Sequence, residues 1–214
     1  MNLAQSFQLG TVSDGTVRVA QTKLNTFFLG LYVALIAGAA ANVLSRYGTD
    51  RDGALAITTA IAILLLVIMF PERTRVSRVT AQVLLLGAIA GFINFVARYY
   101  GERIQITSSG TLSSVLFFLN GVVLAPIYEE MIVRRFMYFG ATRWIGGLMS
   151  AILVSFIFAI THQGMMGYAF FFSLGLCLFA HMGMSTFDRS VLHGAHNLVV
   201  QALFFSGGLH GAIK

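Results

Sequence analysis

The sequence predicts an all-α fold, a polytopic helical bundle that is integral to a membrane and has about seven transmembrane helices. Of the 214 residues, 57% are hydrophobic and only 10% are charged, and the mean hydropathy is +0.80. This composition excludes an ordinary soluble domain. Most basic residues fall between long apolar runs, so the net charge of +6 indicates loops beside a lipid bilayer and no nucleic-acid partner.

Seven apolar runs approach the roughly 20 residues that a helix needs to cross the hydrocarbon core of a bilayer. In chain order, the expected helices cover residues 26–45, 54–70, 79–97, 112–139, 147–162, 167–184 and 191–206. Residues 1–25 form a polar N-terminal segment without the charged start, short apolar core and cleavage site of a secretory signal peptide. The first run is therefore expected to be retained as a span.

The polar residues inside the runs divide the chain into parts. Residues 26–110 hold three apolar runs without a polar motif and are expected to be accessory spans. Residues 111–207 hold every candidate site residue and are expected to form the catalytic core, and residues 208–214 are a short C-terminal tail.

The distribution of arginines predicts the orientation of the bundle. Arg73, Arg75 and Arg78 crowd the second loop, which favours a cytoplasmic N-terminus because cytoplasmic loops carry an excess of basic residues. Other arginines, Arg46 and Arg51 among them, fall on the opposite side and reduce the asymmetry. We expect a multi-pass protein of the cell membrane.

The fourth apolar run contains a proline one turn before two glutamates. Pro126 has no N–H and its ring clashes with the preceding turn, so it should bend the helix and release the carbonyl group of Val122. Glu129 and Glu130 follow directly, and Arg134 comes four residues after Glu130. A charged residue at the centre of a spanning helix costs about 2.5–3.5 kcal/mol, so three of them together indicate a function.

The spacing of these charges predicts different roles for the two acids. Glu130 and Arg134 stand in the favourable order for an ion pair within one helix. Glu129 points about 100° away and remains available as a general base, with a pKa set by desolvation and by the nearby cation. The same three residues would also fit a helix end at the lipid headgroups.

Two further polar motifs lie on later runs. His162 closes the fifth run, where a lone histidine also fits an interfacial residue. His193 and Asn197 are one turn apart at the start of the last run and share a face, where they could donate hydrogen bonds to an oxyanion or join helices. His196 lies off that face and is expected to be a packing or interface residue.

The three motifs, in this order and on apolar runs, resemble those of the CPBP family. These membrane-embedded proteases include CAAX prenyl endopeptidases and bacteriocin-processing or immunity proteins of the ABI type. The resemblance covers about residues 116–206. It is carried by Glu129, Glu130, Arg134, Phe158, His162, His193 and Asn197.

The resemblance implies an intramembrane endopeptidase that hydrolyses a membrane-tethered protein or peptide. Glu129 and His162 would polarise a water molecule that attacks the scissile carbonyl, and His193 and Asn197 would hold the oxyanion. A dry site strengthens both interactions.

Glu130 and Arg134 would support the site. The sequence departs from the family at Arg135, where many members have a small residue. This puts the local packing in doubt, while the catalytic set is unaffected.

Other chemistries remain open from the residues alone. No cofactor is required by the mechanism above, but His162, His193 and Glu129 are residue types that bind zinc. Cys177 and His181 are four residues apart and could form a Cys-His dyad. A non-catalytic membrane scaffold or bacteriocin-immunity protein of the same fold, bound to another membrane protein, and a proton-coupled transporter are the alternatives to a protease.

The depth of the two histidines in their runs predicts an adjustment of the helix ends. His162 lies at the end of its run and His193 near the start of the last one, so straight helices with the boundaries above would separate them. We therefore expect the fifth helix to start later or the last helix to start earlier, with the groups meeting in a polar cavity in the cytoplasmic half of the bundle.

Overall fold

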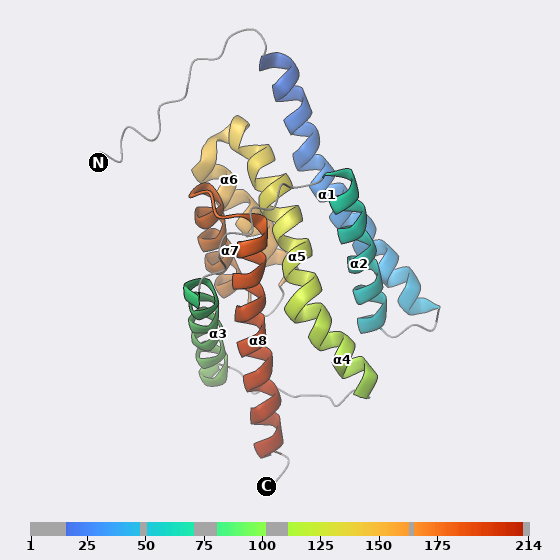
Figure 1. Ribbon diagram of the computed structural model, residues 1–214, viewed down its shortest axis with the longest axis vertical. Coiled ribbons are helices and arrows are strands. Elements are labelled where there is room, and N and C mark those ends of the chain that lie inside the picture. Colours follow the sequence, from blue (N-terminus) through green and yellow to red (C-terminus); the bar gives the residue numbers. More distant parts are fainter. Residues whose placement is uncertain (1–15, 48–50, 71–80, 102–110, 163–164, 212–214) are drawn as a thin grey trace, which may run out of the picture.

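The computed structural model describes residues 16–47, 51–70, 81–101, 111–162 and 165–211, and all regular structure in these ranges is helical. The predicted all-α fold is therefore confirmed. Figure 1 shows the helices packed side by side, with the long helices running up and down the molecule. The number of membrane crossings stays a prediction.

The first three helices overlap the expected runs, although α1 starts earlier. They are α1 (Thr16–Arg46), α2 (Arg51–Met69) and α3 (Ala81–Gly101). Helix α1 starts within the expected polar N-terminal segment, ten residues before the first apolar run. Residues 1–15 and the arginine-rich loop at 71–80 lie outside the described residues.

The fourth helical stretch is continuous from Thr111 to Thr161 and changes its hydrogen-bonding pattern several times. Its parts are α4 (Thr111–Leu119), the π-helical turn η2 (Asn120–Leu124), α5 (Ala125–Glu129), the π-helical segment η3 (Glu130–Tyr138) and α6 (Phe139–Thr161). Gly146 breaks α6 with φ of 75° and ψ of 164°, a conformation that a residue without a Cβ adopts readily. This break separates the expected fourth run from the fifth.

The last two helices are α7 (Met166–His181) and α8 (Thr186–Gly211). The predicted end of the sixth run at residue 184 was wrong, because the chain turns at Gly183, which has φ of 88°. Helix α8 begins at Thr186, five residues before the expected start at 191. The prediction that the last helix starts earlier than the apolar pattern suggests is thus confirmed.

Pro126 lies buried in the first turn of α5 and is accommodated by the π-helical turn before it. The N–H of Ala125 donates to the carbonyl oxygen of Asn120, five residues back. Such π-helical insertions occur often at functional sites because they displace backbone groups from the regular ladder. Here they change the hydrogen-bonding pattern on both sides of α5, which ends at Glu129: in Asn120–Leu124 before it and in Glu130–Tyr138 after it.

Helix α8 is held between α3 on one side and the turn η2 on the other. A Cβ on Gly91 would lie 2.5 Å from the carbonyl oxygen of His196, and one on Gly87 would lie 2.3 Å from that of Leu192. On the other side, a Cβ on Gly194 would lie 2.6 Å from the carbonyl oxygen of Val122. Small residues thus let the backbones approach closely, as they do between helices in membranes, and Figure 1 shows α3 beside α8.

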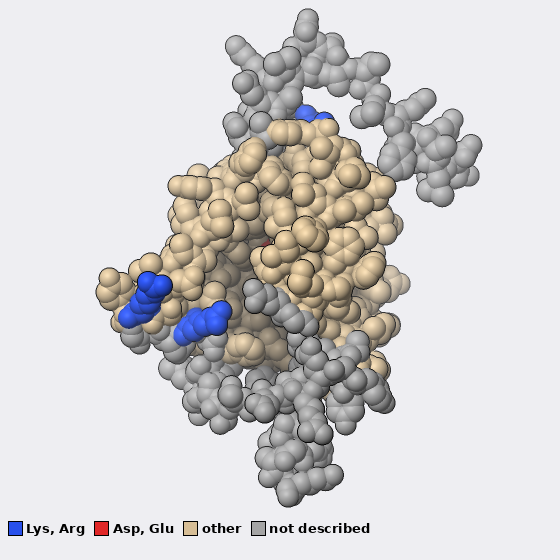
Figure 2. Space-filling view, turned by 180° about the vertical axis from the view of Figure 1, so that it is seen from behind, with Lys and Arg blue, Asp and Glu red and all other residues tan. Residues whose placement is uncertain are grey.

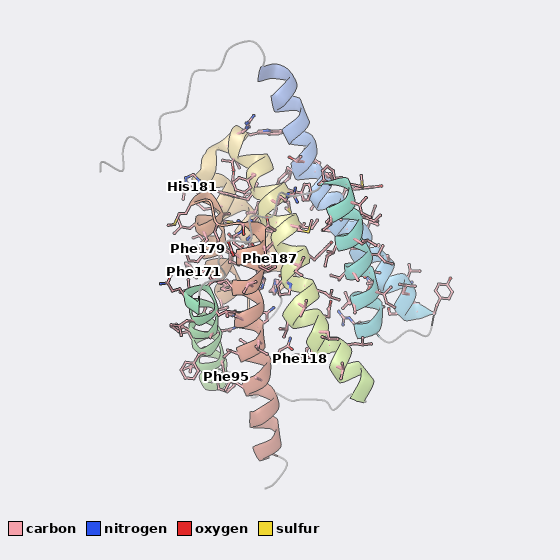
Figure 3. All side chains as sticks on the ribbon, in the orientation of Figure 1. Phe95, Phe118, Phe171, Phe179, His181 and Phe187 are labelled. Carbon is pink, nitrogen blue, oxygen red and sulfur yellow. The ribbon has the colours of Figure 1, made fainter. Side chains whose placement is uncertain are left out.

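Within the residues that the structure describes, two helices are long and apolar enough to cross a membrane, Thr26–Arg46 and Val115–Thr161, and shorter apolar helices cover 53–69, 82–96 and 166–181. Large apolar side chains face outward on many helices, among them Leu148 at 69% and Phe171 at 71% exposure. Figure 3 shows the labelled Phe171 and Phe179 along α7, with His181 at its upper end. An apolar outer surface of this extent is that of a membrane protein.

Candidate functional site

Glu130 is fully buried and bound by two arginines from different helices. Its Oε1 lies 3.0 Å from Nη1 of Arg134, as the four-residue spacing predicts, and its Oε2 accepts a hydrogen bond of 3.1 Å from Nε of Arg189 at the start of α8. Both guanidinium groups are buried as well. A buried carboxylate held by two permanent cations stays ionised and fixed in place.

Arg134 is in turn fixed by α7 and α6. Its Nη2 donates to Oγ of Ser173 at 2.7 Å, and the guanidinium group lies 4.9 Å from the centre of the Phe158 ring. The pair of Glu130 and Arg134 therefore joins the fourth helical stretch to α7, and Arg189 joins it to α8.

Glu129 is the more accessible acid and faces the imidazole of His193. Its Oε2 lies 3.6 Å from Nε2 of His193, and its side chain is 24% exposed. The other ring nitrogen of His193, Nδ1, lies 3.4 Å from Oε1 of Glu130. His193, itself buried, thus lies between the two carboxylates.

Figure 2 shows a deep hollow in a face made largely of residues other than Lys, Arg, Asp and Glu, with a trace of acidic side chain visible inside. Glu130 and Asp188 are 0% and 4% exposed, so Glu129 is the accessible acid among the side chains that the structure describes. Among the side chains that the structure describes, those of Lys and Arg are seen at the top and at the lower left of this face. The hollow gives water a route to a carboxylate inside an apolar surface.

His162 caps the C-terminal end of α6 and stacks on Phe158. The ring centres are 4.2 Å apart, and His193 contacts the same phenyl ring from the other helix at 6.2 Å. The Nδ1 atom of His162 lies 2.8 Å from the carbonyl oxygen of Phe158, an acceptor, so Nδ1 carries the proton. Its Nε2 then presents a lone pair and has no hydrogen-bond partner within the described part of the chain.

Asn197 is one turn after His193 on α8 but makes different contacts. Its Nδ2 donates to the carbonyl oxygen of Gly121 in η2 at 2.7 Å, and its Oδ1 lies 2.8 Å from Nδ1 of His196. The π-helical turn before Pro126 therefore supplies a carbonyl group to Asn197. The carbonyl group of Val122, whose release was predicted, packs against Gly194.

The fold brings Glu129, Glu130, Arg134 and His193 into direct contact. His162 joins them through the shared ring of Phe158, and no hydrogen bond or ion pair connects it to Glu129 or His193 in the ranges that the structure describes. Asn197 is connected to these residues because it lies on α8, the helix that also carries His193. The early start of α8 is what brings His193 level with the end of α6.

Several residues of the site were not expected from the sequence. The residues without an expected role in the site are Ser173, Tyr168, Asn94, His196 and Arg189. For Arg189 a signal existed: Ser185 and Asp188 form a capping box, in which the Asp188 N–H donates to Oγ of Ser185 at 3.1 Å and that hydroxyl donates to the Asp188 carboxylate. This pattern marks a helix start and would have placed Arg189 in the first turn of α8.

The arrangement of the described side chains supports neither the metal site nor the Cys-His dyad. In the described part of the chain, no group of three His, Cys, Asp or Glu side chains is arranged to hold a metal ion. Cys177 is buried and its thiol lies 3.9 Å from Oγ of Ser155, while Nδ1 of His181 lies 3.3 Å from the hydroxyl of Tyr138. The two residues of the predicted dyad therefore face different partners.

Comparison with known proteins gives one finding. Residues 111–199 match the family described as type II CAAX prenyl endopeptidase Rce1-like. This range contains Glu129, His162, His193 and Asn197 and begins at the first residue of α4. No curated protein and no solved structure gives a significant match.

Proposed function

Residues 111–199 belong to the Rce1-like family of type II CAAX prenyl endopeptidases, and from this premise we propose that the protein is an intramembrane endopeptidase. It hydrolyses a peptide bond of a membrane-tethered protein or peptide with water activated by Glu129 and His162. The observation that carries the proposal is the contact of Glu129 with His193 next to a carboxylate, Glu130, that two arginines hold ionised.

The water molecule enters the hollow and lies between Glu129 and His162. Glu129 accepts one proton, and the unprotonated Nε2 of His162 orients the oxygen, which forms a bond to the carbonyl carbon of the substrate. Glu129 then delivers the proton to the nitrogen as the C–N bond breaks, assisted by His193 at 3.6 Å. General acid–base catalysis of this kind contributes about 10²–10⁴-fold.

His193 and Asn197 stabilise the charge that develops on the carbonyl oxygen. Asn197 has two amide protons, and one of them is engaged by Gly121, so the other is available for an oxyanion. His193 can donate through Nε2 when that nitrogen carries a proton, because Nε2 lies 3.6 Å from Glu129 and is not hydrogen-bonded to it. Loss of one such donor costs about 10²–10³-fold in turnover in other enzymes.

Glu130 supports the site through its charges. The carboxylates of Glu129 and Glu130 are balanced by the guanidinium groups of Arg134 and Arg189. These four groups therefore add no net charge to the interior of the bundle. Arg134 and Arg189 both pair with Glu130, so Glu129 remains available as the reactive acid.

The site's position within an apolar bundle supports a substrate that is itself tethered to the membrane. We further infer a multi-pass protein of the cell membrane with about seven spans and a cytoplasmic N-terminus. No metal or other cofactor is needed for the steps above.

The test is cleavage in liposomes that contain the purified protein and a membrane-tethered peptide library, with products identified by mass spectrometry. We expect Glu129→Gln and His162→Ala to abolish cleavage, because each removes one of the groups that activate water. Arg51→Gln, a change at an exposed residue of α2, is the matched control and should retain full activity.

Absence of a cleaved product from the wild type, with binding to another membrane protein intact in both the wild type and Glu129→Gln, would indicate a scaffold in place of a protease. A wild-type rate of cleavage in Glu129→Gln would remove Glu129 from the mechanism. A variant that loses cleavage because it does not fold would show a lower melting temperature in detergent. Glu129→Gln should leave the melting temperature unchanged.

A further inference from the structure

A second polar network lies beside the proposed catalytic groups and centres on His196. We propose that His196 is a positioning residue: its protonated Nδ1 fixes the side-chain amide of Asn197 in the orientation that leaves one N–H free for the oxyanion. This inference rests on the proposed function, because it assigns a purpose to the amide of Asn197.

The carbonyl group of Gly121 decides which end of the Asn197 amide faces it. The carbonyl oxygen only accepts hydrogen bonds, and the Asn197 side chain approaches it to 2.7 Å. The approaching atom must therefore be Nδ2, and the amide oxygen is directed to the opposite side.

His196 occupies that opposite side. Its Nδ1 lies 2.8 Å from Oδ1 of Asn197. Because Oδ1 only accepts, Nδ1 must carry the hydrogen, and a neutral imidazole then has its lone pair on Nε2. The tautomer of His196 and the orientation of Asn197 are thus set together.

The other ring nitrogen is matched to this tautomer by a residue from α3. Nδ2 of Asn94, which is 2% exposed, lies 3.2 Å from Nε2 of His196 and provides a donor for its lone pair. The hydroxyl of Tyr168 lies 2.9 Å from the same nitrogen and 2.9 Å from the carbonyl oxygen of Ala90 on α3.

The ring of His196 is also held by aromatic packing. It stacks on Phe172 at 4.3 Å and on Tyr168 at 5.6 Å between ring centres, and His196 is buried. A ring that packs against two aromatic side chains and has polar neighbours at both nitrogens is held in one orientation, and it passes that orientation to Asn197. Helix α3 therefore contributes to the site through Asn94, although it lies outside the matched range 111–199.

Two substitutions separate this role from simple packing. In His196→Asn the new amide nitrogen can stand where Nδ1 stands, so it keeps the donor to Asn197. In His196→Gln the new amide reaches the place of Nε2 and leaves Oδ1 of Asn197 without a donor. The two variants are matched in chemistry and differ in which nitrogen they replace.

We expect His196→Asn to keep kcat within about threefold of the wild type and His196→Gln to lose on the order of a hundredfold, the loss that we also expect of Asn197→Ala when an oxyanion donor is removed. KM for the tethered peptide should change little in both, because the oxyanion contact forms in the transition state. The double variant His196→Gln with Asn197→Ala should be no slower than Asn197→Ala alone, since both remove one interaction.

Equal rates for His196→Asn and His196→Gln, a loss confined to KM, or fully additive losses in the double variant would overturn the inference. If His196→Gln does not fold, Asn94→Ala and Tyr168→Phe provide the second test, because they loosen the ring and leave His196 in place. Both should lower kcat without raising KM, and wild-type kcat in both would contradict the role.

The same experiment separates the two proposals. Absence of cleavage by the wild type would remove the protease itself and this inference with it, and a wild-type rate in Glu129→Gln would remove the role of Glu129. Loss of cleavage in Glu129→Gln together with full activity in His196→Gln would leave the proposed function standing and remove only the role of His196.

Discussion

Glu130 shows why a single charged residue in an apolar helix demands several partners. An ionised carboxylate without compensation is costly in a low-dielectric interior. Arg134 on the same helix compensates one oxygen and Arg189 on α8 the other. The result is a carboxylate that braces three helices, whereas its neighbour Glu129 keeps access to the hollow.

At this scale we predict that Arg189→Met destabilises the protein by about 3–5 kcal/mol, because it leaves Glu130 with one of its two cations in a buried position. The measurement is the free energy of unfolding in detergent. Arg51→Met removes an exposed arginine from α2 and serves as the control, with an expected change within about 0.5 kcal/mol. Equal stability of the two variants would show that Arg134 alone satisfies Glu130.

The helical elements fix the site by two devices, close packing and a change of helical type. Gly91 and Gly87 let α3 lie against the backbone of α8, and Gly194 lets α8 lie against Val122. The π-helical turn before Pro126 then directs the Gly121 carbonyl to Asn197. Both devices set the height and rotation of α8, and with them the positions of His193 and Asn197.

We predict that Gly91→Ala impairs cleavage more than tenfold and destabilises the fold by about 1–3 kcal/mol, the usual cost of overpacking. The added Cβ would lie 2.5 Å from the carbonyl oxygen of His196 and would push α3 away from α8. Turnover and melting temperature are the measurements.

Gly175→Ala on α7 is the matched control for this prediction, because a Cβ there meets nothing within 4 Å. It should leave turnover and stability unchanged. Similar losses in both variants would mean that the substitution acts through general helix properties and that the contact between α3 and α8 is not the cause.

At the scale of the whole molecule, an apolar outer surface encloses a small, charge-balanced polar centre. The hollow in Figure 2 connects that centre to the exterior. This arrangement confines reactive groups to a site where water is scarce and electrostatic interactions are strong. In the proposed function, substrates that share the membrane with the protein reach such a site without leaving the lipid.

We predict that cleavage in liposomes is unaffected by strong zinc chelators, because the proposed steps use Glu129 and His162 to activate water directly. The initial rate with and without a chelator such as 1,10-phenanthroline, after exhaustive dialysis, is the measurement. Loss of activity on chelation that added zinc restores would replace this mechanism with metal-assisted hydrolysis through His162, His193 and Glu129.

Much of the site could be predicted because its chemistry is local in the sequence. The spacing of Glu130 and Arg134 specifies their ion pair, and the polar residues in apolar runs identify Glu129, His162, His193 and Asn197 as candidates. Arg189 was not identified because it follows a polar stretch that resembles a loop. The role of Asn94 could not be predicted, since nothing along the chain relates it to His196, 102 residues away.

By itself, the sequence determined that the chain is an all-α membrane protein and which side chains have the chemistry for a hydrolytic site, because composition and spacing within a helix are properties of the chain alone. Only the tertiary structure decided that His193 lies between the two glutamates, that Arg189 completes the binding of Glu130, and that α3 takes part through Asn94. These contacts depend on the height and rotation of separate helices. Close packing at glycines and the π-helical turn determine that height and rotation, and hydrophobic periodicity does not encode them.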